Sequence, residues 1–113
     1  MKRGEVWVAN LHPNRGREVG KIRPVLVIQA DFLTSQGSAG VVVLPLTTQV
    51  DPHREPLRLT LAPRDRLRQA SQVMTDQPRT LDRDRFGEGP LTRLTTPEMN
   101  KIEEALLAVL GIY

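Results

Sequence analysis

Residues 22–29, IRPVLVIQ, and residues 41–46, VVVLPL, decide the fold class of this chain. Both runs are apolar and short, so each predicts a fully buried strand. Pro24 lies near the start of the first run, where a missing backbone N–H is tolerated, and Pro45 lies near the end of the second. Two buried strands are therefore the expected centre of the molecule.

Three further segments predict strands around this centre. Residues 5–9 place two valines on one face and Trp7 on the other. Leucines alternate with polar residues in residues 57–61, which predicts a half-buried strand. Residues 70–76 predict another strand, and residues 77–80 are expected to lead away from it.

The last segment of the chain predicts its one long helix. Thr96 has the form of an N-cap, followed by Pro97 at the first helical position and an acidic residue in the first turn. Apolar residues then recur at helical spacing, at Met99, Ile102, Leu106 and Val109. Gly111 is expected to end the helix. A single helical turn is also expected at residues 30–33. The whole pattern is α+β, dominated by a small SH3-like β-barrel whose C-terminal helix packs on the sheet.

Length and composition set further limits. The chain has 113 residues, which predicts a single domain over residues 1–113. A domain this small buries a modest core, so a dimer interface would add stability. The absence of cysteine excludes disulfides and thiolate metal sites. The first residues lack the apolar segment of a signal peptide, and no apolar run is long enough to span a bilayer. We therefore expect a cytoplasmic protein that does not enter membranes.

The charge favours an anionic partner. The formal net charge is +3, and 13 of the 16 basic residues are arginine. The planar guanidinium suits phosphate oxygens, although a GC-rich genome would also enrich arginine. Only four residues are aromatic. That number disfavours RNA-recognition modules that stack several bases on aromatic side chains.

Several kinds of site are absent from the sequence. It has no glycine-rich phosphate loop, no Gly-x-Ser-x-Gly motif and no cluster of metal ligands, so we expect no cofactor and no metal. His12 and His53 lie far apart in loops. A two-histidine ribonuclease mechanism is possible in principle, but nothing in the sequence places the two side chains together.

Polar side chains do gather where the expected strands end. Residues 10–21 and 47–56 are expected to be loops. The candidates for a phosphate site are Arg15, Arg17, Glu18, Lys21, Arg23, Thr47, Thr48, Gln49, Ser71, Asp76, Gln77, Arg79 and Thr80. Such side chains at the ends of buried strands are well placed for a rigid site. The alternative is that each belongs to an ordinary solvated loop.

Four blocks in order resemble the MazF/PemK family of toxins. They are RGEVW at residues 3–7 with GRE at 16–18, RPVLVIQ at 23–29, VLPLTT at 43–48 and DQPRTLD at 76–82. The resemblance implies the CcdB/PemK type of barrel and a homodimer. It also implies a metal-free endoribonuclease that cuts single-stranded RNA at short motifs and is neutralised by an antitoxin protein. In that chemistry the RNA 2′-hydroxyl attacks the adjacent phosphorus and leaves a 2′,3′-cyclic phosphate and a 5′-hydroxyl.

The resemblance also suggests roles for individual residues. Arg23 and Thr47 match catalytic positions of the family, and Glu18 matches an acid of the first loop. Asp76 and Gln77 match residues that line the RNA groove. We expect RNA contacts also from Arg15, Arg17, Lys21, Gln49 and Arg79. Met74 stands where some members carry arginine, so a mechanism that relies on that arginine cannot operate here.

The chemistry needs a base, an acid and charge stabilisation at the phosphoryl oxygens. Arg23 suits the stabilising role and not that of a base, since arginine hardly deprotonates in proteins. Thr47 can donate a hydroxyl proton to a non-bridging oxygen. Glu18 is either the base or an ion-pair partner that orients Arg23, and Asp76 is an alternative base.

Other functions remain open at this stage. The runner-up is a non-catalytic toxin of the CcdB type, which shares the barrel but binds DNA gyrase. A third possibility is an inactive relative that binds RNA or antitoxin without cutting. A generic SH3-like adaptor fits least, because its peptide groove needs several aromatic residues.

Overall fold

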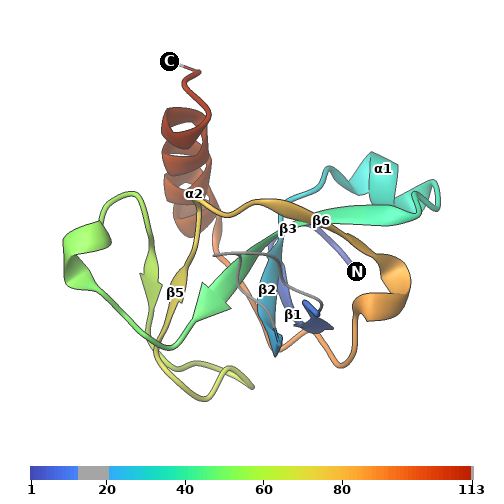
Figure 1. The fold of residues 1–113 in the computed structure, drawn as a ribbon, viewed down its shortest axis with the longest axis horizontal. Coiled ribbons are helices and arrows are strands. Elements are labelled where there is room, and N and C mark those ends of the chain that lie inside the picture. Colours follow the sequence, from blue (N-terminus) through green and yellow to red (C-terminus); the bar gives the residue numbers. More distant parts are fainter. Residues whose placement is uncertain (13–20, 113) are drawn as a thin grey trace.

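The computed structural model describes residues 1–12 and 21–112, and Figure 1 shows the arrangement of its elements. In chain order the strands are β1 (Glu5–Asn10), β2 (Ile22–Val27), β3 (Gly40–Thr47), β4 (Thr60–Leu61), β5 (Ser71–Val73), β6 (Arg79–Asp82) and β7 (Thr92–Arg93). The helices are α1 (Asp31–Ser35) and α2 (Thr96–Val109), with short 3-10 turns at Pro52–Arg54 and Arg83–Arg85. The expected helical turn at residues 30–33 is thus the short helix α1.

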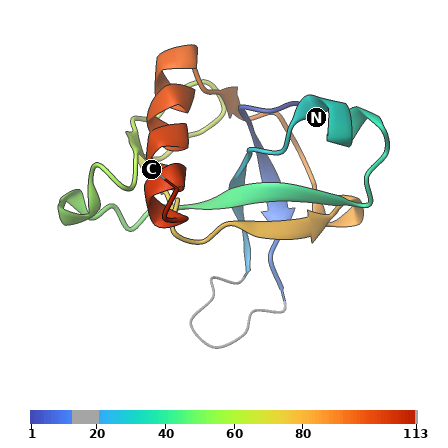
Figure 2. The same ribbon diagram turned by 90° about the horizontal axis from the view of Figure 1, so that it is seen from above.

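The strands form one curled antiparallel sheet in the order β4-β5-β3-β2-β1-β7. The central strand β3 pairs with β2 along one edge, and its other edge pairs first with β6 and then with β5. The partner changes beside Pro45, whose carbonyl accepts a hydrogen bond of 2.8 Å from the amide of Met74. Figure 2 shows β3 (green) and β6 (orange) side by side. The result is the strand-dominated half-barrel with a C-terminal helix that the sequence predicts.

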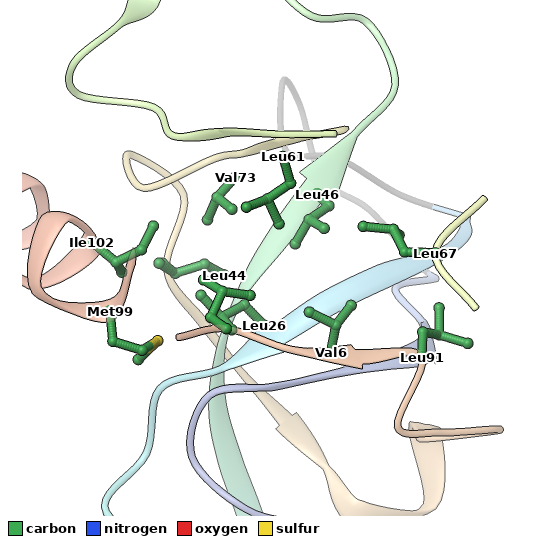
Figure 3. Close-up of a cluster of buried hydrophobic side chains, with 11 residues drawn as sticks. Val6, Leu26, Leu44, Leu46, Leu61, Leu67, Val73, Leu91, Met99 and Ile102 are labelled. Carbon is green, nitrogen blue, oxygen red and sulfur yellow. The ribbon is translucent and has the colours of Figure 1, made fainter. Parts of the chain in front are cut away.

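Both faces of the central strands are buried, as the two apolar runs predict. On one face a cluster that includes Leu26, Leu44 and Leu46 packs against Met99 and Ile102 of α2 (Figure 3). The opposite face holds a second cluster, formed by Ala9, Leu11, Val25, Val27, Val41, Val43 and Leu81. Side chains alternate between the two faces of a strand, so successive residues of β2 and β3 enter different clusters. Both strands are therefore held rigidly up to the point where they end.

Helix α2 begins one residue earlier than the sequence analysis placed it. The N-cap is Thr95, not Thr96: its hydroxyl accepts a hydrogen bond from the amide of Glu98, whose carboxylate accepts one from the amide of Thr95. This reciprocal pair is a capping box. Gly111 ends the helix with a φ of 74°, as expected. No helix among the described residues is long and apolar enough to cross a membrane.

The RGEVW block serves the fold. The backbone amide of Arg3 donates to Asp31, its Nε donates to the carbonyl of Ile28, and its guanidinium pairs with Glu103 of α2 at 2.9 Å. The buried carboxylate of Glu5 accepts hydrogen bonds from three donors, which are the amide of Lys2, the indole of Trp7 and the guanidinium of Arg93. The block therefore ties the first strand to both helices and to β7.

Two predicted segments differ from the structure. Of residues 57–61 only Thr60–Leu61 form a strand; Leu57 is 47% exposed, whereas Arg58 is 8% exposed and pairs with Asp76. The alternation fails at Leu57 and Arg58 because the ion pair draws the arginine inward, whereas Leu59 and Leu61 pack on the core as predicted. Residues 79–82 form strand β6 instead of leaving the sheet, because the first half of β3 supplies a pairing edge distant in sequence.

Candidate functional site

A cavity of about 610 Å³ opens between the start of β2, the end of β3 with the loop after it, and the segment that follows β5. Its lining includes Lys21, Arg23, Thr47, Gln49, Arg54 and Arg58. Among the described lining residues four are basic and one, Asp51, is acidic. The carboxylate of Asp51 lies 3.6 Å from Nε of Arg54, which offsets its charge. The cavity is therefore suited to an anionic group such as a phosphate.

Arg23 lies on β2 and presents a partly buried cation to this cavity. Its Nη1 donates a hydrogen bond of 3.2 Å to the carbonyl of Leu46 on β3. Its Nε is buried and has no hydrogen-bond partner among the described residues. Burial lowers the pKa of the Arg23 guanidinium from its usual value, but arginine stays charged in proteins. The hydrogen bond from Nη1 thus fixes the guanidinium, and further N–H donors of Arg23 remain for a ligand.

Thr47 ends β3 and begins the next wall of the cavity. Its hydroxyl oxygen accepts a hydrogen bond of 3.1 Å from the amide of Gln49. This local turn directs the chain across the cavity. The hydroxyl proton is not used in that bond, so Thr47 can donate it to a ligand.

The buried side-chain amide of Gln72 supports the loop that follows Thr47. Gln72 on β5 is fully buried, and its Nε2 donates to the carbonyl of Asp51 at 2.8 Å and to the hydroxyl of Thr60 at 3.3 Å. The carboxylate of Asp51 in turn accepts a hydrogen bond from the amide of His53. Gln72 therefore connects the loop after Thr47 to the sheet.

Asp76 lies beside the cavity in a fork-to-fork pair with Arg58. Nε and Nη2 of Arg58 donate to its two carboxylate oxygens at 2.8 and 3.0 Å, and Arg54 lies 4.0 Å away. The hydrogen bonds from Arg58 lower the pKa of Asp76, and the charges of Arg58 and Arg54 act in the same direction against partial burial. Asp76 is therefore ionised at neutral pH and weakly basic.

Comparison with known proteins identifies the family. The model of the family described as PemK-like, MazF-like toxin of type II toxin–antitoxin system matches residues 2–110. This chain belongs to that family. The Endoribonuclease MazF of Staphylococcus saprophyticus is 33% identical over 114 aligned positions, which cover 100% of this chain and 93% of that protein. The resemblance found in the sequence is thus confirmed.

Solved structures of the family share the fold. An endoribonuclease in complex with its cognate antitoxin from a mycobacterial species superposes with a TM-score of 0.78 at 28% identity, covering 100% of this chain and 97% of that one. A MazF from Deinococcus radiodurans gives a TM-score of 0.82 at 24% identity, covering 98% and 96%. The likeness extends over the whole toxin.

The structure brings together many of the residues that the sequence singled out. Cavity-lining residues among them are Lys21, Arg23, Thr47, Thr48, Gln49 and Gln77. Asp76 lies beside the cavity, whereas Nη2 of Arg79 donates to the carbonyl of Leu11 and the residue does not line it. Arg15, Arg17 and Glu18 lie outside the described residues. Met74, two residues before Asp76, is buried and forms part of the wall.

Sequence reasoning missed Arg54, Arg58 and Gln72. Arg58 stands between leucines in an alternating stretch, which predicts a solvent-facing side chain. Gln72 stands at a strand position where an amide gives no sign of burial. The available signal was the excess of arginine in the chain, but it does not tell which arginines lie together.

A metal centre finds no support among the described residues. No group of three or more histidine, aspartate or glutamate side chains in residues 1–12 and 21–112 could hold a metal ion. The backbone amide of Lys21 donates a hydrogen bond of 3.4 Å to Nδ1 of His12, and the amide of His53 bonds to Asp51. These contacts place the two histidines in separate loops.

Proposed function

We propose that this MazF-type toxin is an endoribonuclease that cuts single-stranded RNA without a metal. The 2′-hydroxyl oxygen forms a bond to the adjacent phosphorus as the bond from phosphorus to the 5′-oxygen breaks. The 2′-hydroxyl gives its proton to the base, and the departing 5′-oxygen takes up a proton from an acid or from water, so the products are a 2′,3′-cyclic phosphate and a 5′-hydroxyl. The endoribonuclease class rests on family membership and on the relative from Staphylococcus saprophyticus. The cavity with Arg23 beside Thr47 is the observation that supports this chemistry.

Arg23 and Thr47 are assigned to the phosphoryl oxygens in this proposal. Negative charge grows on these oxygens during the attack, and donors fixed in advance stabilise it most effectively. Arg23 is fixed through its hydrogen bond to Leu46 and lines the cavity, while Thr47 has a hydroxyl proton to donate. Lys21, Gln49 and Gln77 extend the same wall and are assigned to RNA binding.

The base is assigned to Glu18, whose alternative role is to orient Arg23. Asp76 is a poorer candidate, because its carboxylate is held by Arg58 and its pKa is lowered. A base works best with a pKa near the operating pH. Arg15, Arg17 and Arg79 complete the proposed RNA contacts.

Two protein partners belong to the proposal. The related mycobacterial endoribonuclease is seen with its cognate antitoxin, and we propose an antitoxin for this chain that blocks the RNA site. We also propose a homodimer in the cytoplasm, where the RNA substrate is found. Light scattering on the purified toxin, freed from antitoxin, would give the mass of a dimer.

Cleavage of a mixed-sequence single-stranded RNA in EDTA tests the activity. We expect discrete cuts whose 3′ ends carry cyclic phosphate, and we expect Arg23→Ala to lose them. Arg66→Ala is the matched control, because Arg66 is an exposed arginine paired with Glu88 and does not line the cavity. It should cut at the rate of the wild type.

The opposite result would support a different class of toxin. A folded dimer that cuts no RNA at any concentration would overturn the proposal and favour a CcdB-type gyrase binder or an inactive relative. Cleavage that requires added Mg²⁺ would overturn the metal-free reaction alone.

A further inference from the structure

Arg58 is a buried cation in the wall of the cavity. The residue is 8% exposed, and its only charged partner among the described residues is Asp76. Burying a charge is costly unless it is paired and hydrogen-bonded. The two partners differ in exposure, since the side chain of Asp76 is 39% exposed and that of Arg58 only 10%. A surface carboxylate thus holds an inward-facing guanidinium.

The geometry of the pair leaves part of the guanidinium available. Nε and Nη2 donate to the two oxygens of Asp76. Nη1 makes no hydrogen bond within the part of the chain that the structure describes, and Arg58 lines the cavity. A guanidinium has five N–H donors in a fixed fork. Its remaining donors can therefore bind a phosphate while Asp76 keeps its orientation fixed.

Arg58 and Arg23 belong to different sides of the cavity. Arg23 lies on β2, and Arg58 comes just before β4, with β3 and β5 between these two strands. The two side chains therefore enter the cavity from strands that are not neighbours in the sheet. A single strand of RNA that crosses the strand ends would meet both.

We infer that Arg58, oriented by Asp76, binds a phosphate of the RNA backbone other than the one held by Arg23. This inference rests on the proposed ribonuclease function. It makes Asp76 a positioning residue that acts through Arg58. Arg58 also supplies a guanidinium to the cavity that Met74 lines, and some members of the family carry an arginine in place of Met74.

Binding of an uncleavable RNA tests the role of Arg58. The probe is the oligonucleotide mapped in the cleavage assay, with a single 2′-deoxy residue at the cut site. For Arg58→Met we expect at least tenfold weaker binding. We also expect the slope of log K against log salt to fall by about 0.7, the value for one lost phosphate contact on a single strand. In cleavage KM should rise more than kcat falls. Arg66→Met, which removes an exposed ion-paired arginine elsewhere, should change none of these.

Asp76→Asn separates positioning from simple charge repulsion. Removing a carboxylate near RNA would tighten binding if the charge alone mattered. If Asp76 positions Arg58, Asp76→Asn weakens binding instead. The double variant Asp76→Asn/Arg58→Met should bind no more weakly than Arg58→Met alone. The acidic limb of the pH–rate profile should persist in Asp76→Asn, because the residue is not the base.

Failures of the two proposals can be told apart. If the wild type neither cuts nor binds RNA, the proposed function fails. If the wild type cuts but Arg58→Met binds the probe as tightly, or Asp76→Asn binds it more tightly, only the inference on Arg58 fails. Arg58→Lys guards against loss of the fold, because it keeps the charge but not the fork. Binding intermediate between wild type and Arg58→Met, with an unchanged circular dichroism spectrum, is the expected result.

Discussion

Thr47 shows how one side chain can serve the fold and the proposed chemistry together. Its hydroxyl oxygen accepts the hydrogen bond from the amide of Gln49 that turns the chain after β3. The hydroxyl proton remains for a phosphoryl oxygen. A residue at this place needs an acceptor for the turn and a donor for the substrate, and a hydroxyl supplies both.

Substitutions at Thr47 therefore have separable effects. Thr47→Val removes the hydroxyl and keeps the β-branched shape, and we expect kcat to fall by about 100- to 1,000-fold, as for the loss of one transition-state donor. Thr47→Ser keeps the hydroxyl and should stay within about tenfold of the wild type. Single-turnover cleavage with excess toxin measures both. Equal rates for valine and serine would show that the hydroxyl takes no part.

Residues that a motif marks could be predicted from the sequence, and residues placed by the fold could not. Arg23 lies at the start of one apolar run and Thr47 directly follows the other, and the structure puts both at one cavity. Arg58 is set by its pair with Asp76, which lies 18 positions away in the sequence. No local pattern records such a pair, so the alternation of residues 57–61 misplaced Arg58 although it placed Leu61 in the core correctly.

The same contrast holds for whole elements. Strands β2 and β3 and helix α2 carry strong local patterns, and all three were predicted. Strand β6 has one buried residue, Leu81, and exists because β3 offers it an edge. Gly40 permits this pairing, since a Cβ atom there would lie 2.5 Å from a methyl group of Thr80. Contacts between distant segments decide such a strand.

The start of α2 can be tested with two neighbouring threonines. Thr95→Ala removes the N-cap hydroxyl that accepts from Glu98, and the expected cost is about 1 kcal/mol of unfolding free energy. Thr96→Ala changes the first helical residue, whose side chain caps nothing, and should cost far less. Urea denaturation followed by circular dichroism gives both values. A larger loss at Thr96 would place the cap where the sequence first suggested.

At the scale of the whole molecule, carboxylates hold distant segments together. Nη1 of Arg64, in the turn before β5, donates to Glu98 of α2, and its Nε donates to Thr92 of β7. Glu5 of β1 accepts from Arg93 of β7. Burial alone would raise the pKa of Glu5, but hydrogen bonds from Arg93, Trp7 and the amide of Lys2 lower it. The stability of the toxin should therefore depend on pH in acid.

Glu98 allows this dependence to be measured at one site. The hydrogen bond from Arg64 lowers its pKa below the usual 4.5. A lowered folded pKa means that the stabilisation is fully present above pH 4.5 and is lost as the pH falls through the folded value. Glu98→Gln keeps a side chain suited to the capping box but removes the charge. We expect it to lower the unfolding free energy by about 1 kcal/mol at pH 7, a loss of a few degrees in Tm. In thermal melts from pH 7 to pH 3, the Tm values of the wild type and the variant should converge below pH 4.5. A difference in Tm that stays constant over this pH range would mean that the charge of Glu98 does not stabilise the fold.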